Sequence, residues 1–193
     1  MCKNNGIGYK GGIPWHIKAD LQHFSKLTRG NGKGNGKGNG NSNSTNALIM
    51  GATTWKSLPQ GEMGLKDRDN LVLSKSSQRF DKYVNHERLI KTFESCDELE
   101  RFVNHAVKYD ELWVIGGAQI YDYFLSAKKI KKCYITYIDK NFECDTFFPV
   151  LDMTQWKEVE RRSEYDSKYD CSVDYVVYEY IEDLDNTVVN YKS

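Results

Sequence analysis

Short apolar runs alternate along this chain with stretches of helical pattern, and no other feature constrains its fold as strongly. The runs at residues 47–50 (ALIM), 70–73 (NLVL) and 112–115 (LWVI) consist almost wholly of apolar side chains. Such runs are typical of strands that are covered on both faces of a sheet. Helical patterns occupy residues 96–107 and 118–125. The alternation predicts an α/β fold with a mostly parallel, twisted central sheet flanked by helices.

The last third of the chain has a different pattern, which predicts antiparallel pairing. Residues 132–138 (KCYITYI) indicate one more strand, and residues 156–162 and 172–180 alternate polar with apolar side chains as a closing hairpin does. The chain has 193 residues, of which 39% are hydrophobic and 28% charged, and this suits one domain. We therefore expect a single domain over residues 1–181 and a tail at 182–193.

One segment is unsuited to a core. Residues 30–46 (GNGKGNGKGNGNSNSTN) repeat glycine and asparagine in a pattern of low complexity. These residues carry almost no apolar surface and are costly to order. We expect them to form a surface insertion between a helix and a strand of the same domain.

Charge, cysteine and histidine usage exclude several classes of protein. Lys plus Arg and Asp plus Glu number 27 each, so there is no basic excess for binding nucleic acid. Five cysteines without a CxxC pair argue against a disulfide framework or a zinc site, and the four histidines show no metal-ligand spacing. There is no signal-like start and no apolar run of about 18 residues. We expect a cytoplasmic protein without a metal, a nucleic-acid partner or a membrane segment.

An acidic side chain lies on the apolar face of the first predicted helix. At 100° per residue, Ile17, Leu21, Phe24 and Leu27 form one stripe, and Asp20 falls inside it. Burying a carboxylate among apolar side chains disfavours its charged form, which is the usual route to a proton donor or charge partner. The alternative is a capping role, in which the carboxylate accepts hydrogen bonds from free backbone N–H groups. Periodicity alone leaves both interpretations open.

Two of the predicted strands end at glycine and lead into a helix. Residues 112–115 run into Gly116 and Gly117, and an earlier strand runs into Gly51. Such a junction lets the backbone approach a ligand closely and aims free N–H groups at phosphate. Two junctions could hold the two ends of a pyrophosphate-containing cofactor, with Lys75 as a cation for a further phosphate. Tight turns without a ligand and a solvated surface lysine are the alternatives on spacing alone.

Taken together, the segments resemble the dihydrofolate reductase family. The matching segments are GIGYKGGIPW leading into KADLQHF, then LIMGATTWKSLP, LKDRDNLVLS, WVIGGAQIYDYF and YITYIDKNFECDTFFP. They follow the family's order and spacing from residue 4 to about 180. The resemblance implies an NADPH-dependent oxidoreductase that reduces 7,8-dihydrofolate to 5,6,7,8-tetrahydrofolate. It also implies a role in one-carbon metabolism, thymidylate and purine precursor supply, and antifolate binding.

The resemblance assigns roles to the residues of a folate pocket. Asp20 matches the acidic residue that binds the pterin ring and supports protonation at N5, and Thr136 matches the threonine that braces it. Arg68 stands where the family's arginine pairs the α-carboxylate of the glutamate tail, for which a planar fork suits better than lysine. The substrate-binding residues implied are Leu21, Phe24, Leu58, Arg68, Ile115, Tyr121 and Thr136.

The resemblance also implies an NADPH site. Residues 8–13 match the mobile loop that closes over the nicotinamide and excludes water. The cofactor-binding residues implied are Ile7, Gly8, Ile13, Gly51, Ala52, Thr53, Thr54, Leu73, Ser74, Lys75, Gly116, Gly117, Ala118, Gln119 and Ile120. Ala52 stands where relatives often carry Arg or Lys, so selectivity for the 2′-phosphate rests more heavily on Lys75. Trp15 and Trp55 match family tryptophans that either pack in the core or contact ligand.

The start of the chain departs from the family pattern. Members carry an apolar first strand of about seven more residues, whereas only Met1 and Cys2 precede Lys3. We expect that strand to be absent from the chain as given. Three alternatives follow: the natural start lies upstream, another segment such as the tail at 182–193 fills the gap, or the domain is weakened. One alternative function is a folate- or nucleotide-binding module with little or no turnover. Another is a pterin or riboflavin-pathway reductase, which the pairing of an acid with Arg68 disfavours. A monomer is the default expectation.

Overall fold

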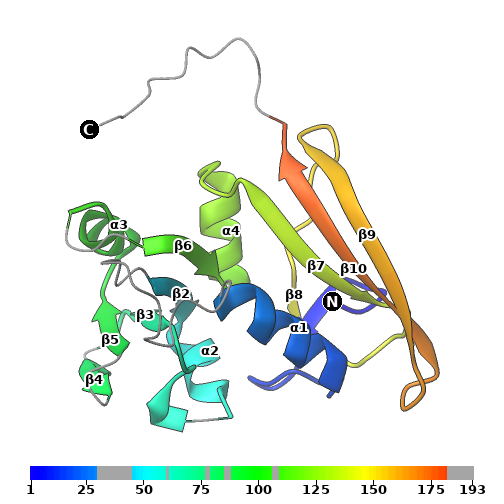
Figure 1. Cartoon of the computed structure of the whole chain (residues 1–193), viewed down its shortest axis with the longest axis horizontal. Helices are drawn as coiled ribbons and strands as arrows, with labels where there is room; N and C mark the ends of the chain where they lie inside the picture. Colours follow the sequence, from blue (N-terminus) through cyan, green and yellow to red (C-terminus); the bar gives the residue numbers. More distant parts are fainter. Residues whose placement is uncertain (30–44, 60, 77–78, 85–87, 106–108, 182–193) are drawn as a thin grey trace, which may run out of the picture.

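The computed structural model describes residues 1–29, 45–59, 61–76, 79–84, 88–105 and 109–181. Its helices are α1 (Lys18–Arg29), α2 (Ala52–Ser57), α3 (Cys96–His105) and α4 (Ala118–Ser126), with a 3-10 turn at Gly61–Met63 (Figure 1). Its strands are β1 (Gly6–Gly8), β2 (Thr45–Gly51), β3 (Asp69–Leu73), β4 (Lys82–Val84), β5 (Arg88–Phe93), β6 (Tyr109–Val114), β7 (Lys132–Ile138), β8 (Thr146–Phe147), β9 (Trp156–Asp166) and β10 (Cys171–Tyr180). None of these helices is long and apolar enough to cross a membrane.

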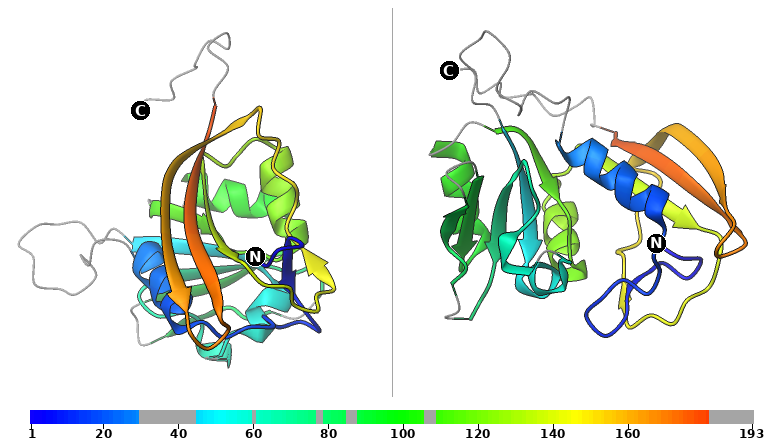
Figure 2. Two further views of the ribbon diagram at one scale, coloured as in Figure 1. Left: turned by 90° about the vertical axis from the view of Figure 1, so that its right-hand side faces the viewer. Right: turned by 60° about the horizontal axis from the view of Figure 1, so that its bottom comes forward.

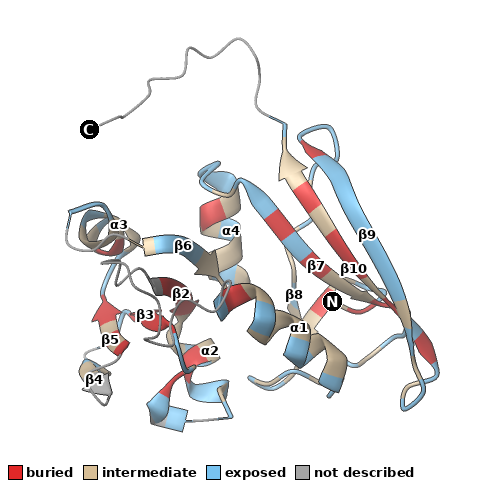
Figure 3. Ribbon diagram, in the orientation of Figure 1, coloured by how far each residue is buried: buried red, intermediate tan, exposed pale blue. Residues whose placement is uncertain are grey.

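The larger sheet has five strands in the order β4-β5-β3-β2-β6 and confirms the predicted α/β fold. Strand β2 pairs in parallel with β3 and β6, and β3 pairs in parallel with β5, whereas β4 runs antiparallel at the edge. Alternate residues of β2 supply two cores: Ala47 and Ile49 pack with Phe124 of α4, whereas Leu48 and Met50 pack with residues of α2 and β3. The centre of the sheet is therefore covered on both faces, as the apolar runs at residues 47–50 and 70–73 predict (Figure 3). The same expectation is wrong for residues 112–115, because β6 is an edge strand and Leu112 is 45% exposed.

The second sheet, in the order β7-β10-β9, is antiparallel throughout and confirms the C-terminal hairpin. Ile17, at the start of α1, is buried in its core with Ile138 and Val173. At its other end, α1 reaches the five-stranded sheet, where the Asn46 amide of β2 donates to the carbonyl oxygen of Thr28 (3.0 Å). Helix α1 consequently lies between the two sheets (Figure 2).

Several boundaries and elements differ from those predicted. Thr45 and Asn46 belong to β2 and not to the Gly/Asn insertion, because Thr45 pairs with Tyr109 of β6 and the Asn46 side chain donates to both α1 and β6. The rest of that insertion, residues 30–44, and the tail at 182–193 lie outside the described residues. Helix α3 ends at His105, and residues 106–108 are not described.

Strands β1, β4, β5 and β8 were not predicted. Three of them have only two or three residues, too few for a periodic signal. Strand β5 (RLIKTF) mixes charged with apolar side chains, yet Arg88 and Thr92 are buried in it. Because these buried residues are polar, β5 does not show the unbroken apolar run by which the other parallel strands were predicted.

The start of the chain runs beside β7. The backbone N–H of Ile138 donates to the carbonyl of Met1 (2.9 Å), and Cys2 forms a parallel bridge with Ile138. The first described strand, β1, comes later and pairs antiparallel with β8. Among the described residues, no strand is hydrogen-bonded to both β6 and β7, which differs from the continuous sheet that the family's first strand implies.

Candidate functional site

Asp20 lies in the first turn of α1 and faces strand β7. Its carboxylate Oδ1 accepts a hydrogen bond from the Thr136 hydroxyl (2.7 Å). Among the described residues, Thr136 is the hydrogen-bond donor to this carboxylate, and no backbone N–H of α1 donates to it. The capping interpretation is therefore wrong. The side chain is half-buried, because Ile17 one turn earlier anchors the helix in the core of the three-stranded sheet.

Two further groups surround this carboxylate. The Met1 amine donates to the Thr136 carbonyl, and burial lowers the pKa of this amine while the Asp20 charge partly offsets that effect. His23, one turn along α1, packs edge-on against the Tyr175 ring with centroids 4.5 Å apart. Burial is the main reason that the pKa of His23 is lowered. Tyr175 lies opposite Thr136 in the β7–β10 register, so one sheet position braces both α1 side chains.

Arg68 lies at the other end of α1, immediately before β3. Its guanidinium NH1 donates to the Thr28 hydroxyl, its Nε donates to the Lys66 carbonyl (2.9 Å), and the group sits 5.9 Å from the centroid of the Phe24 ring. Thr28 follows Asp20 by eight residues, which is about 12 Å along a helix. Helix α1 therefore carries a carboxylate near one end and holds a guanidinium near the other.

The electrostatic state of Arg68 is unusual for an arginine. The residue is only 2% exposed, and its hydrogen-bond acceptors among the described residues are a hydroxyl and a carbonyl and not a carboxylate. Burial, followed by the charge of Arg29, lowers the pKa of Arg68 to about 10. A buried cation of this kind is stabilised by an incoming anion.

The remaining predicted substrate residues fall into two groups. Phe24 is half-buried beside Arg68, but Leu21 is 44% exposed and does not belong to the core, which corrects the expectation that the whole α1 stripe is buried. Leu58, at the end of α2, and Ile115, after β6, pack against the same buried cluster around Trp55. Trp55 is thus a core residue, whereas Trp15 is half-buried and packs on the Phe142 ring (5.2 Å).

The two glycine junctions meet at the carboxyl edge of the five-stranded sheet. The backbone N–H of Gly51 donates to the carbonyl of Gly116 (2.8 Å), and the Gly116–Gly117 peptide bond is cis. Gly116 has φ +106°, and a Cβ there would lie 2.9 Å from the Tyr121 ring. A Cβ on Gly51 would lie 3.3 Å from Ile120. The Tyr121 and Ile120 side chains pack on this backbone so closely that a Cβ has no room at Gly116 and little at Gly51.

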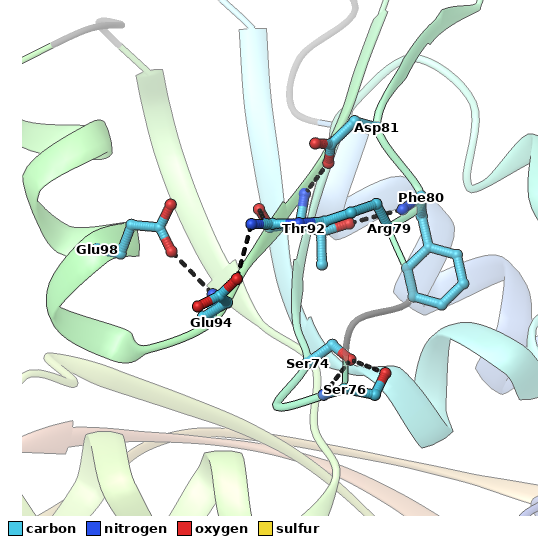
Figure 4. Close-up of polar contacts among 8 residues, drawn as sticks. All are labelled: Ser74, Ser76, Arg79, Phe80, Asp81, Thr92, Glu94 and Glu98. Atoms are coloured by element: carbon cyan, nitrogen blue, oxygen red, sulfur yellow. Dashed lines mark hydrogen bonds and ion pairs between the residues drawn. The ribbon is translucent and has the colours of Figure 1, made fainter.

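The same edge carries the end of β3. In the parallel register, Leu73 is the partner of both Gly51 and Phe93, so the residues after Leu73 follow the glycine junctions along one edge. At such an edge, open α/β sheets bind their ligands. Ser74 is buried, and its hydroxyl is hydrogen-bonded with that of Ser76 (2.9 Å, Figure 4). Lys75 between them is exposed.

Arg79 is a second cation beside this loop that the sequence reasoning missed. Its guanidinium donates to the carboxylate of Glu94 and to the carbonyl of Thr92, both at 2.9 Å (Figure 4). Its place four residues after Lys75, in the loop that follows a strand, was the available signal. Thr28 was missed as well, although it lies eight residues after Asp20 on the same helix.

The other predicted cofactor residues lie on α2, on α4 and in the first loop. Ala52 and Thr54 are half-buried and Thr53 is exposed in the first turn of α2. At the start of α4, Ala118 and Ile120 are half-buried and Gln119 is exposed. Ile7 and Gly8 belong to β1, and Ile13 is 62% exposed beyond a turn closed by paired backbone hydrogen bonds between Tyr9 and Gly12. Among the described residues, no three His, Cys, Asp or Glu side chains gather closely enough to hold a metal ion.

Comparison with known proteins gives one consistent result. The family model described as dihydrofolate reductase matches residues 40–180. The dihydrofolate reductase of Heliothis virescens is 32% identical over 159 residues, which are 82% of this chain and 80% of that protein. The enzyme of Drosophila melanogaster is 32% identical over 154 residues, covering 78% and 76% of the two chains. The viral dihydrofolate reductase of Saimiriine herpesvirus 2 is 34% identical over 156 residues, covering 80% and 68%.

Proposed function

Because the chain belongs to the dihydrofolate reductase family of oxidoreductases, we propose that it reduces 7,8-dihydrofolate to 5,6,7,8-tetrahydrofolate with NADPH as the hydride donor. The observation that carries this proposal is the pair of polar anchors along α1. Asp20 is braced by Thr136 near one end, and the buried Arg68 guanidinium meets Thr28 near the other, about 12 Å away along the helix. This spacing suits an elongated substrate with a polar ring at one end and a carboxylate at the other.

The proposed role of Asp20 is to bind the pterin ring and to support protonation at N5. Its Oδ1 accepts from Thr136, which leaves the other carboxylate oxygen to accept from the ring's amino group. The hydroxyl of Thr136 holds the carboxylate in one orientation, as a positioned acid–base group requires. Bound NADPH would supply the hydride to the ring carbon next to N5.

The proposed role of Arg68 is to bind the α-carboxylate of the glutamate tail. A guanidinium that already lies in a buried position loses little entropy on binding, and a planar fork can bind both carboxylate oxygens. We propose that three side chains contact the aromatic part of the substrate: Phe24 beside Arg68, Leu21 one turn earlier on α1, and Leu58 at the end of α2. The exposure of Leu21 is consistent with a wall residue and not with a core residue.

The carboxyl edge of the five-stranded sheet supports the proposed NADPH site. Gly51 and Gly116 present bare backbone in contact with each other, and the pyrophosphate of a dinucleotide can approach such a surface closely. Lys75 and Arg79 in the loop after β3 are proposed to bind the 2′-phosphate in place of the cation that Ala52 does not provide. Residues 8–13 are proposed to close over the nicotinamide and to exclude water from hydride transfer.

The wider role follows from this reaction. We propose that the chain supplies tetrahydrofolate for one-carbon metabolism in the cytoplasm, that antifolates bind in the same cleft, and that the protein works as a monomer.

The test is turnover in the presence of dihydrofolate and NADPH, followed as loss of absorbance at the nicotinamide band. Wild type should turn over, and Asp20→Asn should lose at least about 100-fold in turnover, because a positioned acid–base group contributes about that much. Asp97→Asn, an exposed carboxylate at the start of α3, is the matched control and should keep the wild-type rate.

The alternatives have distinct outcomes. Turnover that survives Asp20→Asn would contradict the assigned role of this carboxylate. Saturable quenching of tryptophan fluorescence by NADPH or an antifolate, without turnover, would favour the binding module. A preference for NADH over NADPH would contradict a 2′-phosphate site at Lys75 and Arg79.

A further inference from the structure

Two cysteines that are far apart in sequence lie next to the loop of residues 8–13, which is called the first loop below. The Sγ atoms of Cys2 and Cys144 lie 3.7 Å apart, although the residues are separated by 142 positions. Both thiols are free, Cys2 is buried, and Cys144 is half-buried. The Cys2 thiol also donates to the side-chain oxygen of Asn4 (2.8 Å). One sulfur is thus accessible from solvent in part, and the other lies directly behind it.

Gly6 makes room for this pair. A Cβ at Gly6 would lie 2.3 Å from the Cys144 sulfur and 2.9 Å from the Cys2 sulfur. A backbone turn places the glycine there, since the N–H of Cys2 donates to the Gly6 carbonyl (3.0 Å) and the N–H of Asn5 donates to the Cys2 carbonyl (2.9 Å). The contact between the sulfurs is therefore set by backbone geometry and not by a freely rotating surface side chain.

The neighbours of Cys144 hold the first loop in place. The Tyr9 hydroxyl donates to Glu143 (2.7 Å), and the backbone N–H of Lys10 donates to the carboxylate of Asp145 (2.7 Å). The backbone N–H of Asp145 donates in turn to the carbonyl of Gly8 (3.0 Å). A covalent bond at Cys144 would consequently restrict the movement of the first loop, residues 8–13.

We propose that Cys2 and Cys144 are a reversible dithiol–disulfide site that is oxidised by low-molecular-weight disulfides of the glutathione class. The Cys144 thiolate attacks one sulfur of the external disulfide, whose S–S bond breaks and releases one thiolate. Deprotonated Cys2 then attacks the Cys144 sulfur, breaks the mixed disulfide and releases the second thiolate. Two protein thiols lose two electrons and two protons, and one external disulfide becomes two thiols.

The surroundings make this oxidation slow. Burial, together with the hydrogen bond and charge of Cys2, raises the pKa of Cys144 to about 11. Because the thiolate is the attacking species, only a small fraction reacts at neutral pH.

The experiment is oxidation of the full chain with glutathione disulfide, followed by tryptic digestion without reduction. Cleavage after Lys3, Lys140 and Lys157 should release residues 1–3 joined to residues 141–157, at a mass about 2 Da below the sum of the two peptides. Closing so large a ring should raise the melting temperature by roughly 5–10 °C, reversibly with dithiothreitol. Cys144→Ser, which keeps the size of the side chain, should show neither effect, and Cys96→Ser on α3 should show both.

Three results would overturn the proposal. They are stable glutathionylation of Cys144 without the cross-link, a cross-link to another cysteine, and a Cys2–Cys144 bond that dithiothreitol does not reduce.

A consequence for catalysis rests on the proposed function. Oxidised protein should turn over dihydrofolate at least about twofold more slowly, because the tethered first loop opens less readily, and dithiothreitol should restore the rate. Equal rates for the reduced and cross-linked protein would contradict an effect of the disulfide on the movement of the first loop. Lack of turnover in the reduced protein would instead contradict the proposed function and leave the peptide map as the test of the disulfide.

Discussion

Replacing Arg68 with methionine should separate folding from substrate binding. Arg68 is buried, it is a cation, and its two hydrogen-bond acceptors among the described residues are uncharged. In the folded protein its pKa falls to about 10 because of burial and the charge of Arg29. The unfolded chain therefore holds the Arg68 proton more tightly, and the charged side chain destabilises the fold at every pH below about 10.

The size of this effect follows from the structure. At about 1.4 kcal/mol for each pH unit, the lowered pKa corresponds to about 3 kcal/mol of unfavourable charge burial. Methionine removes that cost and the two hydrogen bonds of Arg68, which have a charged donor and contribute about 1.5 kcal/mol each at the lower end of their range. Thr28 keeps its own hydrogen bond to the Phe24 carbonyl (2.8 Å). The two terms nearly cancel, so Arg68→Met should change the free energy of unfolding by less than about 1 kcal/mol, or by less than roughly 4 °C in melting temperature.

The effect on catalysis should be much larger than the effect on stability. A charge-assisted hydrogen bond to a carboxylate contributes about 1.5–3 kcal/mol, so kcat/KM for dihydrofolate should fall about 10- to 150-fold. The loss should appear mainly in KM, because the glutamate tail lies far from the reacting ring. A dihydropterin without a glutamate tail should lose less than about twofold. Arg101→Met, on the exposed face of α3, is the control and should change neither quantity.

Calorimetry and steady-state kinetics on the same preparations decide the matter. A loss of more than about 2 kcal/mol in Arg68→Met would mean that this arginine is a structural residue and that the reasoning from its unpaired charge is wrong. Equal losses of kcat/KM for the substrates with and without the tail would refute a carboxylate-binding role.

Three further predictions address other parts of the site. Thr136→Val should lower kcat/KM about 10-fold or more with little change in stability, because the hydroxyl orients the neighbouring carboxylate while valine suits a strand; wild-type kinetics would contradict this role. Gly116→Ala should cost about 1–3 kcal/mol, because its φ is +106° and its Cβ would crowd a ring, whereas Gly12→Ala should be nearly neutral in urea unfolding; equal effects would contradict the argument. Burial lowers the pKa of His23, so stability should fall as the pH drops below about 6.5, and His23→Gln should reduce the fall in urea midpoint between about pH 7.5 and 5.5; an unchanged fall would exclude this histidine as its source.

The parallel strands could be predicted from the sequence because two-sided burial leaves an unbroken apolar run. Residues 47–50 and 70–73 were found in this way, and they form the centre of the five-stranded sheet. The run at 112–115 led to the edge strand β6, although Leu112 is 45% exposed there. Strand β5 could not be found, since its buried Arg88 and Thr92 make contacts that only the folded chain reveals. Burial of a polar residue depends on hydrogen-bond partners from distant segments of the chain, and a local sequence pattern does not identify those partners.

The candidate site shows the same division. Helical periodicity places Asp20 and Phe24 on one face of α1, but it also predicts that Leu21 is buried, and Leu21 is exposed. Nothing in the local sequence shows that Thr136, 116 positions away, donates to Asp20. Likewise, the Gly51–Gly116 hydrogen bond depends on the parallel pairing of β2 with β6. The resemblance to a family supplied the contact between Thr136 and Asp20 as an expectation, but it did not supply the contact between Gly51 and Gly116.

The position of α1 explains why the two polar anchors can be tested independently. Its first turns pack on the three-stranded sheet through Ile17 and His23, and its last turn binds the five-stranded sheet through Thr28. A helix of 12 residues is stiff over this length, so the distance between its ends is set by its own hydrogen bonds and not by either sheet. A substitution at Arg68 should therefore leave the Asp20 end in place. Coupling between the two in a double-mutant cycle should stay within about 0.5 kcal/mol, and a larger value would mean that α1 moves as a whole when one anchor is lost.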